Sequence, residues 1–183
     1  MQAKSAQSSR TTITELMIPS YANFGGKIHG GILLSLMDKV AYATATKHSG
    51  AYCVTVSVDN VDFLQPVEVG DLVSMLASVN YVGNSSMIIG IKVIAENVKT
   101  GLVKHTNTSY FTMVAKNEDG SLKTVPKLIL KSKDDVRRFA EAVKRKQLRK
   151  SYQEQMESEK SAFTIEKQKE LIDNQRCEVK MEE

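Results

Sequence analysis

The sequence contains no Trp, only 3 Pro and only 2 Cys, and these two, Cys53 and Cys177, lack the spacing of a metal site. It therefore argues against a disulfide scaffold or a zinc knuckle, and a reduced, cytoplasmic compartment fits best. No apolar stretch approaches the roughly 20 residues of a membrane helix, and residues 1–10 lack the apolar centre of a secretory signal. What remains is 183 residues, 42% of them hydrophobic, which suffices for one ordinary domain with a real core.

The net charge of +4 is unevenly distributed along the chain. Residues 1–121 are neutral overall, residues 122–150 carry a net +8, and residues 151–183 carry a net −4. A basic segment attracts nucleic acid without specificity, but this one contains Phe139 as its single aromatic residue and matches no nucleic-acid-binding motif. We therefore interpret it as a solvated helical face and expect no nucleic-acid partner and no membrane partner.

Hydrophobic periodicity predicts one buried helix and a set of long strands. Apolar residues lie on almost every side of Ile32–His48, which is typical of a helix buried in a core. Gly50 follows Lys47 and His48 of the last turn, and this order is a helix-stop signal. Elsewhere the apolar period is two, with hairpin turns at 83–85 and 99–101, and this predicts strands over Thr11–Met17, from Tyr52, and over Leu72–Val82, Ser86–Asn97 and Leu102–Ala115.

These elements predict an α+β fold in which an antiparallel sheet wraps around a central helix, the architecture of the hot-dog fold. We expect residues 1–10 to be flexible and residues 11–131 to form this domain, with a bulge near Asp59-Asn60 where the apolar parity changes. Residues 132–150 then form a basic helix, and residues 151–183 a charged helical or flexible tail. The apolar stripe of the basic helix is expected to consist of Val136, Phe139, Ala140 and Val143.

Asp38 does not fit the apolar helix in which it lies, between Met37 and Ala41. Carboxylates are rarely buried unless they are paired. One interpretation is a partly exposed Asp beside Lys39. The other is a carboxylate held dry, so that its basicity is available for catalysis. The pattern alone leaves both open.

The start of the helix and the loop before it carry the other candidate groups. In His29-Gly30-Gly31 the backbone N–H groups at a helix start are free of bulky side chains and could hold an oxyanion. Paired glycines also serve simply to let a helix pack closely. The carboxamide of Asn23 could orient a water molecule or a carbonyl, although a loop Asn is often only a turn residue.

The order of four sequence blocks resembles that of the hot-dog acyl-CoA thioesterases, in particular bacterial cytosolic long-chain acyl-CoA hydrolases related to brain acyl-CoA hydrolase. Four ordered blocks are more specific than a lone glycine motif, and together they cover roughly Glu15 to Arg149. The blocks are Ala22–Gly31 with Leu36-Met37-Asp38, Val54–Asp59 with Phe63–Asp71, Gly83–Met87, and the stretch after Val125-Pro126.

The resemblance implies hydrolysis of acyl-CoA to free fatty acid and CoA, without metal or organic cofactor. It implies Asp38 as catalytic general base or nucleophile, a choice that the sequence leaves open, Asn23 as catalytic carboxamide, and Gly30 and Gly31 as the oxyanion or substrate-carbonyl site. It also implies that Asn23 and Asp38 meet across a homodimer interface, and that three dimers form a hexamer. His29 is an alternative base, but we interpret its side chain as structural.

The same resemblance places CoA contacts at Asn84, Ser85 and Ser86. Lys92, a cation on a predicted strand, is a further candidate for a contact with the CoA phosphates. Asn84 stands where family members often have Arg, so a phosphate contact is missing there or is supplied elsewhere. The basic segment would then be a collar that steers an anionic substrate. The alternative function is a non-catalytic hot-dog module that binds acyl-CoA or a regulatory protein.

Overall fold

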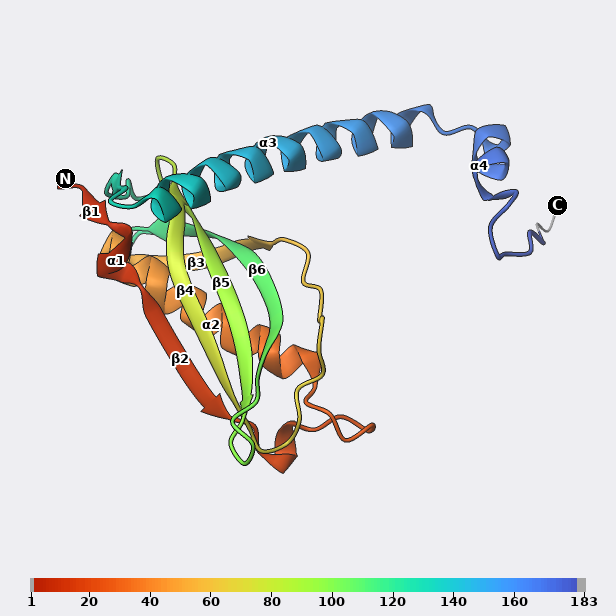
Figure 1. Cartoon of the computed structure of the whole chain (residues 1–183). Helices are drawn as coiled ribbons and strands as arrows, with labels where there is room; N and C mark the ends of the chain where they lie inside the picture. The colour runs from red at the N-terminus through yellow and green to blue at the C-terminus, as the bar shows by residue number, and fades with distance from the viewer. Residues whose placement is uncertain (1, 181–183) are drawn as a thin grey trace. The chain divides into compact units, whose positions relative to one another are not determined.

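The computed structural model describes residues 2–180, which fall into two units, one up to Ala142 and one from Val143 onward. Hydrogen bonding divides the chain into short terminal elements, one long helix followed by long strands, and a helical C-terminal part (Figure 1). In chain order the elements are β1 (Lys4–Ser5), α1 (Ala6–Ser9), β2 (Thr11–Leu16), the 3-10 helix η1 (Pro19–Tyr21), α2 (Gly30–Ser49), β3 (Tyr52–Val58), β4 (Asp71–Val82), β5 (Ser86–Asn97), β6 (Val103–Lys116), β7 (Leu128–Ile129), α3 (Lys133–Ala162) and α4 (Ile165–Ile172).

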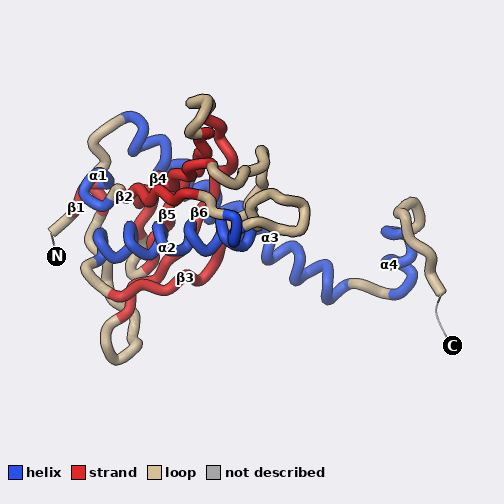
Figure 2. The backbone as a smooth tube through the Cα atoms, turned by 90° about the horizontal axis from the view of Figure 1, so that it is seen from below, coloured by secondary structure: helices blue, strands red, loops and turns tan. Residues whose placement is uncertain are grey.

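Five strands form one antiparallel sheet in the order β2-β4-β5-β6-β3. The sheet curls around α2, which lies along its inner face (Figures 1 and 2). The alternating apolar residues of β4, β5 and β6 point at the helix because successive strand residues face opposite sides. The α+β hot-dog architecture is therefore confirmed.

The core lies between the inner face of the sheet and one side of α2. Met37, Val40 and Ala41 of the helix are fully buried against strand residues such as Met75 and Phe111. Each large apolar side chain removed from water contributes roughly 1.5–3 kcal/mol. Since the sheet covers only one side of α2, the expectation that the helix is buried all round is wrong for a single chain.

Both ends of α2 are set by capping residues. His29 is the N-cap residue, with a side chain that accepts a hydrogen bond from the helix start. Gly50 ends the helix at φ 66° in the left-handed region, as the stop signal predicts. The helix begins two residues before the expected Ile32 because the glycines adopt helical angles.

The N-terminal residues are more ordered than their polar composition suggests. Lys4–Ser5 pairs in parallel with Leu128–Ile129, and the Lys4 ammonium donates to the carbonyl oxygen of His48 over 2.8 Å. Ala6 and Ser9 are buried. The expected flexibility of residues 1–10 is therefore wrong for residues 4–9, because long-range backbone pairing and a cation at the C-terminal end of α2 hold them.

The expected bulge near Asp59-Asn60 is absent from the described strands, because β3 ends at Val58 and Asp59–Gly70 is a connection. The register shift between β3 and β6 lies earlier, between Thr55 and Ser57. The change in apolar parity near Asp59-Asn60 in the sequence therefore marks the end of β3 and not a bulge within it. The strands predicted over β4, β5 and β6 are confirmed to within one residue at each end.

The first turns of α3 pack only partly through the predicted stripe, since Phe139 makes a contact and Val136 is exposed. Asp135 and Ala142 are buried, whereas Val136 is 54% exposed. Asp135 accepts hydrogen bonds from the backbone N–H groups of Lys131 and Ser132, and Ser132 Oγ accepts from its N–H in return. This reciprocal capping sets the rotation of the helix and brings the ring of Phe139 against Tyr81 at 5.2 Å.

In the second unit α3 continues past Lys150 to Ala162, and the described side chains beyond that point are exposed. Its surface carries exposed pairs such as Lys150–Glu154, which contribute little to stability. None of the helices that the structure describes has the length and apolar content needed to cross a membrane.

Candidate active site

Asp38 lies on the side of α2 that the sheet leaves uncovered. Its Oδ1 accepts a hydrogen bond from Thr55 Oγ1 of β3 at 2.5 Å. The two line a hollow of about 480 Å³ together with Lys39, Tyr42 and the first residues of β3. The carboxylate is exposed in the single chain, so the interpretation as a partly exposed Asp beside Lys39 describes the isolated protomer, and the dry carboxylate does not.

Thr55, the hydrogen-bond partner of Asp38, is a candidate site residue that sequence reasoning missed. Its hydroxyl also lies 3.2 Å from the sulfur of Met113. On the sequence, Thr55 is one of several polar residues that alternate along a strand, which indicates only a solvent-facing position. The contact with Asp38 depends on how β3 lies across α2, and the local pattern does not contain that information.

The start of α2 holds the candidate oxyanion site. The N–H of Gly31 donates to Nδ1 of His29 at 2.9 Å, so this donor has an internal partner in the structure. A Cβ at Gly31 would lie 3.0 Å from the same imidazole. A Cβ at Gly30 would lie 3.3 Å from the ring of Phe63. Both glycines therefore admit a neighbouring ring, which supports the packing interpretation beside the catalytic one.

Asn23 organises the loop before α2. Its Oδ1 accepts from the N–H groups of Gly25 and Lys27 at 2.9 and 3.2 Å. The Lys27 ammonium bridges to Glu68 at 2.6 Å and ties this loop to the 67–70 turn. In the described part of the chain Nδ2 of Asn23 has no hydrogen-bond partner, which leaves an amide donor at the surface of the loop.

The structure does not bring Asn23 and Asp38 together within one chain. No hydrogen bond joins them among residues 2–180, since Asn23 accepts from its own loop and Asp38 accepts from Thr55 of β3. Both lie on exposed surface, and Phe24 beside Asn23 is fully exposed. One protomer thus presents two separate halves of the expected site.

The residues expected at CoA also separate in space. Asn84, Ser85 and Ser86 belong to the β4–β5 hairpin, whose backbone is held by bonds from Val125 N to Asn84 O and from Ala115 N to Ser85 O at 2.8 and 2.9 Å. Lys92 lies in mid-β5 and lines a different hollow. Among the described residues no group of three His, Cys, Asp or Glu is arranged to hold a metal ion.

Sequence relatives identify the family. The profile of the thioesterase superfamily matches residues 25–102. Protein VdlD of Helicobacter pylori is 46% identical over 144 residues, which are 79% of this chain and 82% of that protein. YkhA of Bacillus subtilis, which is named an uncharacterized acyl-CoA thioester hydrolase, is 32% identical over 150 residues, which are 82% of this chain and 87% of that protein. The chain belongs to the thioesterase superfamily. The enzyme class is therefore confirmed as thioester hydrolase.

Solved structures extend the comparison. A hexameric acyl-CoA thioesterase in its apo form superimposes with a TM-score of 0.80 at 36% identity, over 83% of this thioesterase and 97% of that chain. The acyl-CoA hydrolase of Staphylococcus aureus, solved with butyryl-CoA and CoA, gives 0.77 at 31% identity, over 87% and 96%. Variants of that enzyme with an Asn, an Asp or a Thr replaced by Ala have been solved. The three positions are 15 and 17 residues apart, the separations of Asn23, Asp38 and Thr55 in this thioesterase.

Proposed function

We propose that the protein hydrolyses acyl-CoA to a free fatty acid and CoA at a site formed by Asn23, Asp38 and Thr55. The observation that carries this proposal is the hydrogen bond from Thr55 Oγ1 to Asp38 Oδ1. It joins two residues whose types and spacing match the Asp and Thr replaced in the Staphylococcus aureus enzyme. The hot-dog relatives that bind CoA support the same substrate class.

Asp38 supplies the basicity for the reaction. Acting as general base, it takes a proton from water as the water oxygen attacks the thioester carbonyl carbon. Acting as nucleophile, it attacks that carbon itself and a water molecule later releases the acid. In both routes the carbon–sulfur bond breaks and the CoA thiolate leaves and takes up a proton. Thr55 holds Oδ1, so Oδ2 is the oxygen that remains for the reaction.

The oxyanion that forms on the carbonyl requires preorganised donors. Two donors fit this role, Nδ2 of Asn23 and the N–H of Gly31 at the positive end of α2. Because His29 Nδ1 accepts from Gly31 in the structure, the imidazole has to turn away when the carbonyl oxygen binds. Gly30 contributes by leaving room for Phe63 at the helix start.

A second copy of the chain completes the site. The side of α2 that carries Asp38 also exposes Leu34 and Tyr42, and the sheet-edge strand β3 beside it exposes Tyr52 and Val56. An apolar surface next to an open strand edge is a typical interface between copies. We infer a homodimer in which Asn23 of one chain approaches Asp38 of its partner, and three dimers in a hexamer, as the hexameric relative supports.

CoA phosphates are expected at the β4–β5 hairpin, where Ser85 and Ser86 offer hydroxyl donors and Asn84 an amide. The basic segment 122–150 would steer the anionic substrate towards the protein.

A thiol-release assay with acyl-CoA of increasing chain length tests the function. Wild-type protein should release CoA, and Asp38→Asn should lower kcat by about 10³-fold, since general-base catalysis contributes about 10²–10⁴-fold. Light scattering provides the control, because the variant should keep the assembly of the wild type. Full activity in Asp38→Asn would exclude the assignment. Ligand-induced stabilisation without thiol release would instead indicate a binding module.

A further inference from the structure

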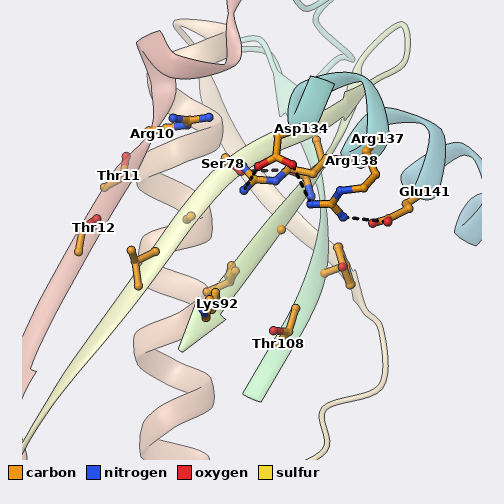
Figure 3. A pocket seen from close by; sticks show the side chains of 16 residues that line it. Arg10, Thr11, Thr12, Ser78, Lys92, Thr108, Asp134, Arg137, Arg138 and Glu141 are labelled. Carbon is orange, nitrogen blue, oxygen red and sulfur yellow. Dashed lines mark hydrogen bonds and ion pairs between the residues drawn. The ribbon is translucent and has the colours of Figure 1, made fainter. Parts of the chain in front are cut away.

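The helix α3 changes character where it enters the second unit. In its first turns side chains pair along the helix, as in the contacts of Arg137 with Asp134 and Glu141 at 3.4 and 2.8 Å (Figure 3). Further along, every side chain of residues 150–162 is exposed in the single chain. In proteins most of the stability of a helix comes from packing one of its sides rather than from propensity. This stretch of α3 is therefore expected to have a packed side.

One side of the exposed stretch carries large apolar residues. Leu148, Tyr152 and Met156 are 57%, 63% and 37% exposed. Because they are spaced by four residues, they lie within an arc of about 80° around the helix axis. Apolar residues that recur at this spacing form the packing side of an amphipathic helix. The single chain leaves this side open to solvent.

Two opposite charges lie at the ends of this apolar side. Arg145 comes three residues before Leu148, and Glu159 comes three residues after Met156. The same helical geometry places both charged residues on the side of the apolar ones. In chain order this side presents a cation, three apolar side chains and a carboxylate, arranged symmetrically about Tyr152. We call these five residues the distal face.

The distal face is complementary to an antiparallel copy of itself. A two-fold axis through Tyr152 places Leu148 opposite Met156 of the second copy, and Arg145 opposite Glu159 of that copy. Apolar side chains then meet in the middle, and opposite charges meet at both ends. A parallel copy would instead place Arg145 against Arg145 and Glu159 against Glu159, and such like-charge contacts are unfavourable.

The rest of the helix agrees with this direction. All five charged residues of 143–150 are basic, whereas three of the four in 151–162 are Glu. An antiparallel pair therefore sets a basic half against an acidic half. On the side opposite the distal face, Lys150 and Glu154 pair within the chain at 3.6 Å, which is typical of a solvent-facing side.

We propose that the distal face binds a second copy of this chain, as an antiparallel pair of α3 helices with Tyr152 on the two-fold axis. The same residues of both copies form the contact, as in most two-fold interfaces between identical chains. This contact is distinct from the dimer proposed at α2 and β3, and it requires neither Asp38 nor substrate.

Disulfide cross-linking in the full chain tests the direction of the pair. The distal-face variant Leu148→Cys/Met156→Cys, in a Cys177→Ser background that removes the exposed native thiol, keeps apolar side chains at both positions. After oxidation, mass spectrometry should find position 148 of one chain joined to position 156 of another. The two positions of one chain cannot join, because about 12 Å of helix separates their Cα atoms and a disulfide needs less than about 7 Å.

The matched control is Lys150→Cys/Glu154→Cys in the same background, since these positions lie on the opposite side of the helix. It should give little product between chains. Arg145→Glu, added to the distal-face variant, brings two carboxylates together in the antiparallel pair. It should lower the yield at least about threefold, and further addition of Glu159→Arg should restore it, because each pair of helices contains this charge contact twice.

Disulfides that join only 148 to 148 and 156 to 156 would show a parallel pair and overturn the proposal. So would the absence of product between chains, equal yields from the two sides of the helix, or failure of Glu159→Arg to restore the yield lost in Arg145→Glu. Circular dichroism checks that each variant keeps its helix content. The reduced distal-face variant should keep wild-type thiol release, so the outcome does not depend on the proposed function.

Discussion

The two sides of α2 have different tasks. Its inner side carries Met37 and Val40, which are fully buried against the sheet. Its outer side carries Leu34, Asp38 and Tyr42, all exposed in the single chain. Met37 and Asp38 are neighbours in sequence, yet Met37 belongs to the core and Asp38 to the proposed site. The inner side therefore specifies the fold, whereas the outer side carries the proposed chemistry and is the surface that we propose a second chain covers.

Among the substitutions that leave Asn23 and Asp38 unchanged, the largest effect should come from disrupting the proposed dimer contact over the outer side of α2. Tyr42→Glu places a charge on the outer side of α2, next to Tyr52, whose ring centroid lies 6.2 Å away. The charge should dissociate the proposed dimer and separate Asn23 from Asp38. Loss of an oxyanion donor costs about 10²–10³-fold in kcat, so activity should fall by about that factor while the protomer stays folded.

Light scattering and thiol release, measured on the same sample, check this expectation. Leu102→Glu is the control, because Leu102 is an exposed apolar residue in the β5–β6 turn, away from α2. It should change neither size nor activity. An active monomer of Tyr42→Glu would show that one chain contains a complete site.

Thr55→Val tests whether catalysis by Asp38, on the outer side of α2, depends on its hydrogen bond from β3. Valine keeps the shape of threonine but removes the donor to Asp38 Oδ1. A hydrogen bond to a charged group is worth about 1.5–3 kcal/mol, so kcat should fall about 10–100-fold with little change in KM. Thr55→Ser restores a hydroxyl and should recover most of the activity. If Thr55→Val had wild-type kcat, Asp38 would not need this partner.

Much of the fold was predictable because its signals are local. The apolar alternation of β4, β5 and β6 gave their bounds, and Gly50 marked the end of α2. Asn23 and Asp38 were expected as site residues from the sequence blocks in which they lie. Their positions in space were not, because the exposure of Asp38 depends on which side of α2 the sheet covers.

Other features depend on pairing between distant parts of the chain. Lys4–Ser5 is held by Leu128–Ile129, and Thr55 meets Asp38 only when β3 lies across α2. The rotation of α3 follows from the capping by Asp135 rather than from its apolar residues. No periodicity within one element reports such contacts.

His29→Ala tests whether the N-cap of α2 acts only on stability or also in catalysis. The substitution removes the acceptor for the Gly31 N–H and should lower the free energy of unfolding by about 1 kcal/mol or less, as for other N-caps. Because the ring is proposed to leave when substrate binds, kcat should change by less than about tenfold. Urea unfolding and thiol release measure the two effects. A loss of about 10³-fold in kcat would instead make His29 the base.

The smallest effect should come from the buried end of α2. His48 is fully buried, its Nε2 lies 2.9 Å from the carbonyl oxygen of Pro126, and its Nδ1 has no partner among the described residues. Burial lowers the pKa of His48 below its ordinary value, and the charge of Lys4 adds to this, while the hydrogen bond to Pro126 opposes it. The neutral imidazole is therefore the form that the fold stabilises.

The unfolded state, with a pKa of about 6.5, takes up this proton before the folded state does. The contribution of His48 to stability is thus complete above about pH 6.5 and decreases as the pH falls towards the lower pKa of the folded state. Urea unfolding at pH 7.5 and 5.5 should show this loss, and His48→Gln, which keeps a donor for Pro126 but cannot titrate, should show a smaller one. An equal pH dependence in both proteins would assign the proton uptake to other groups. Since His48 lies away from the outer side of α2, the variant should also keep its thiol-release activity at pH 7.5, which separates stability at the inner side from chemistry at the outer side.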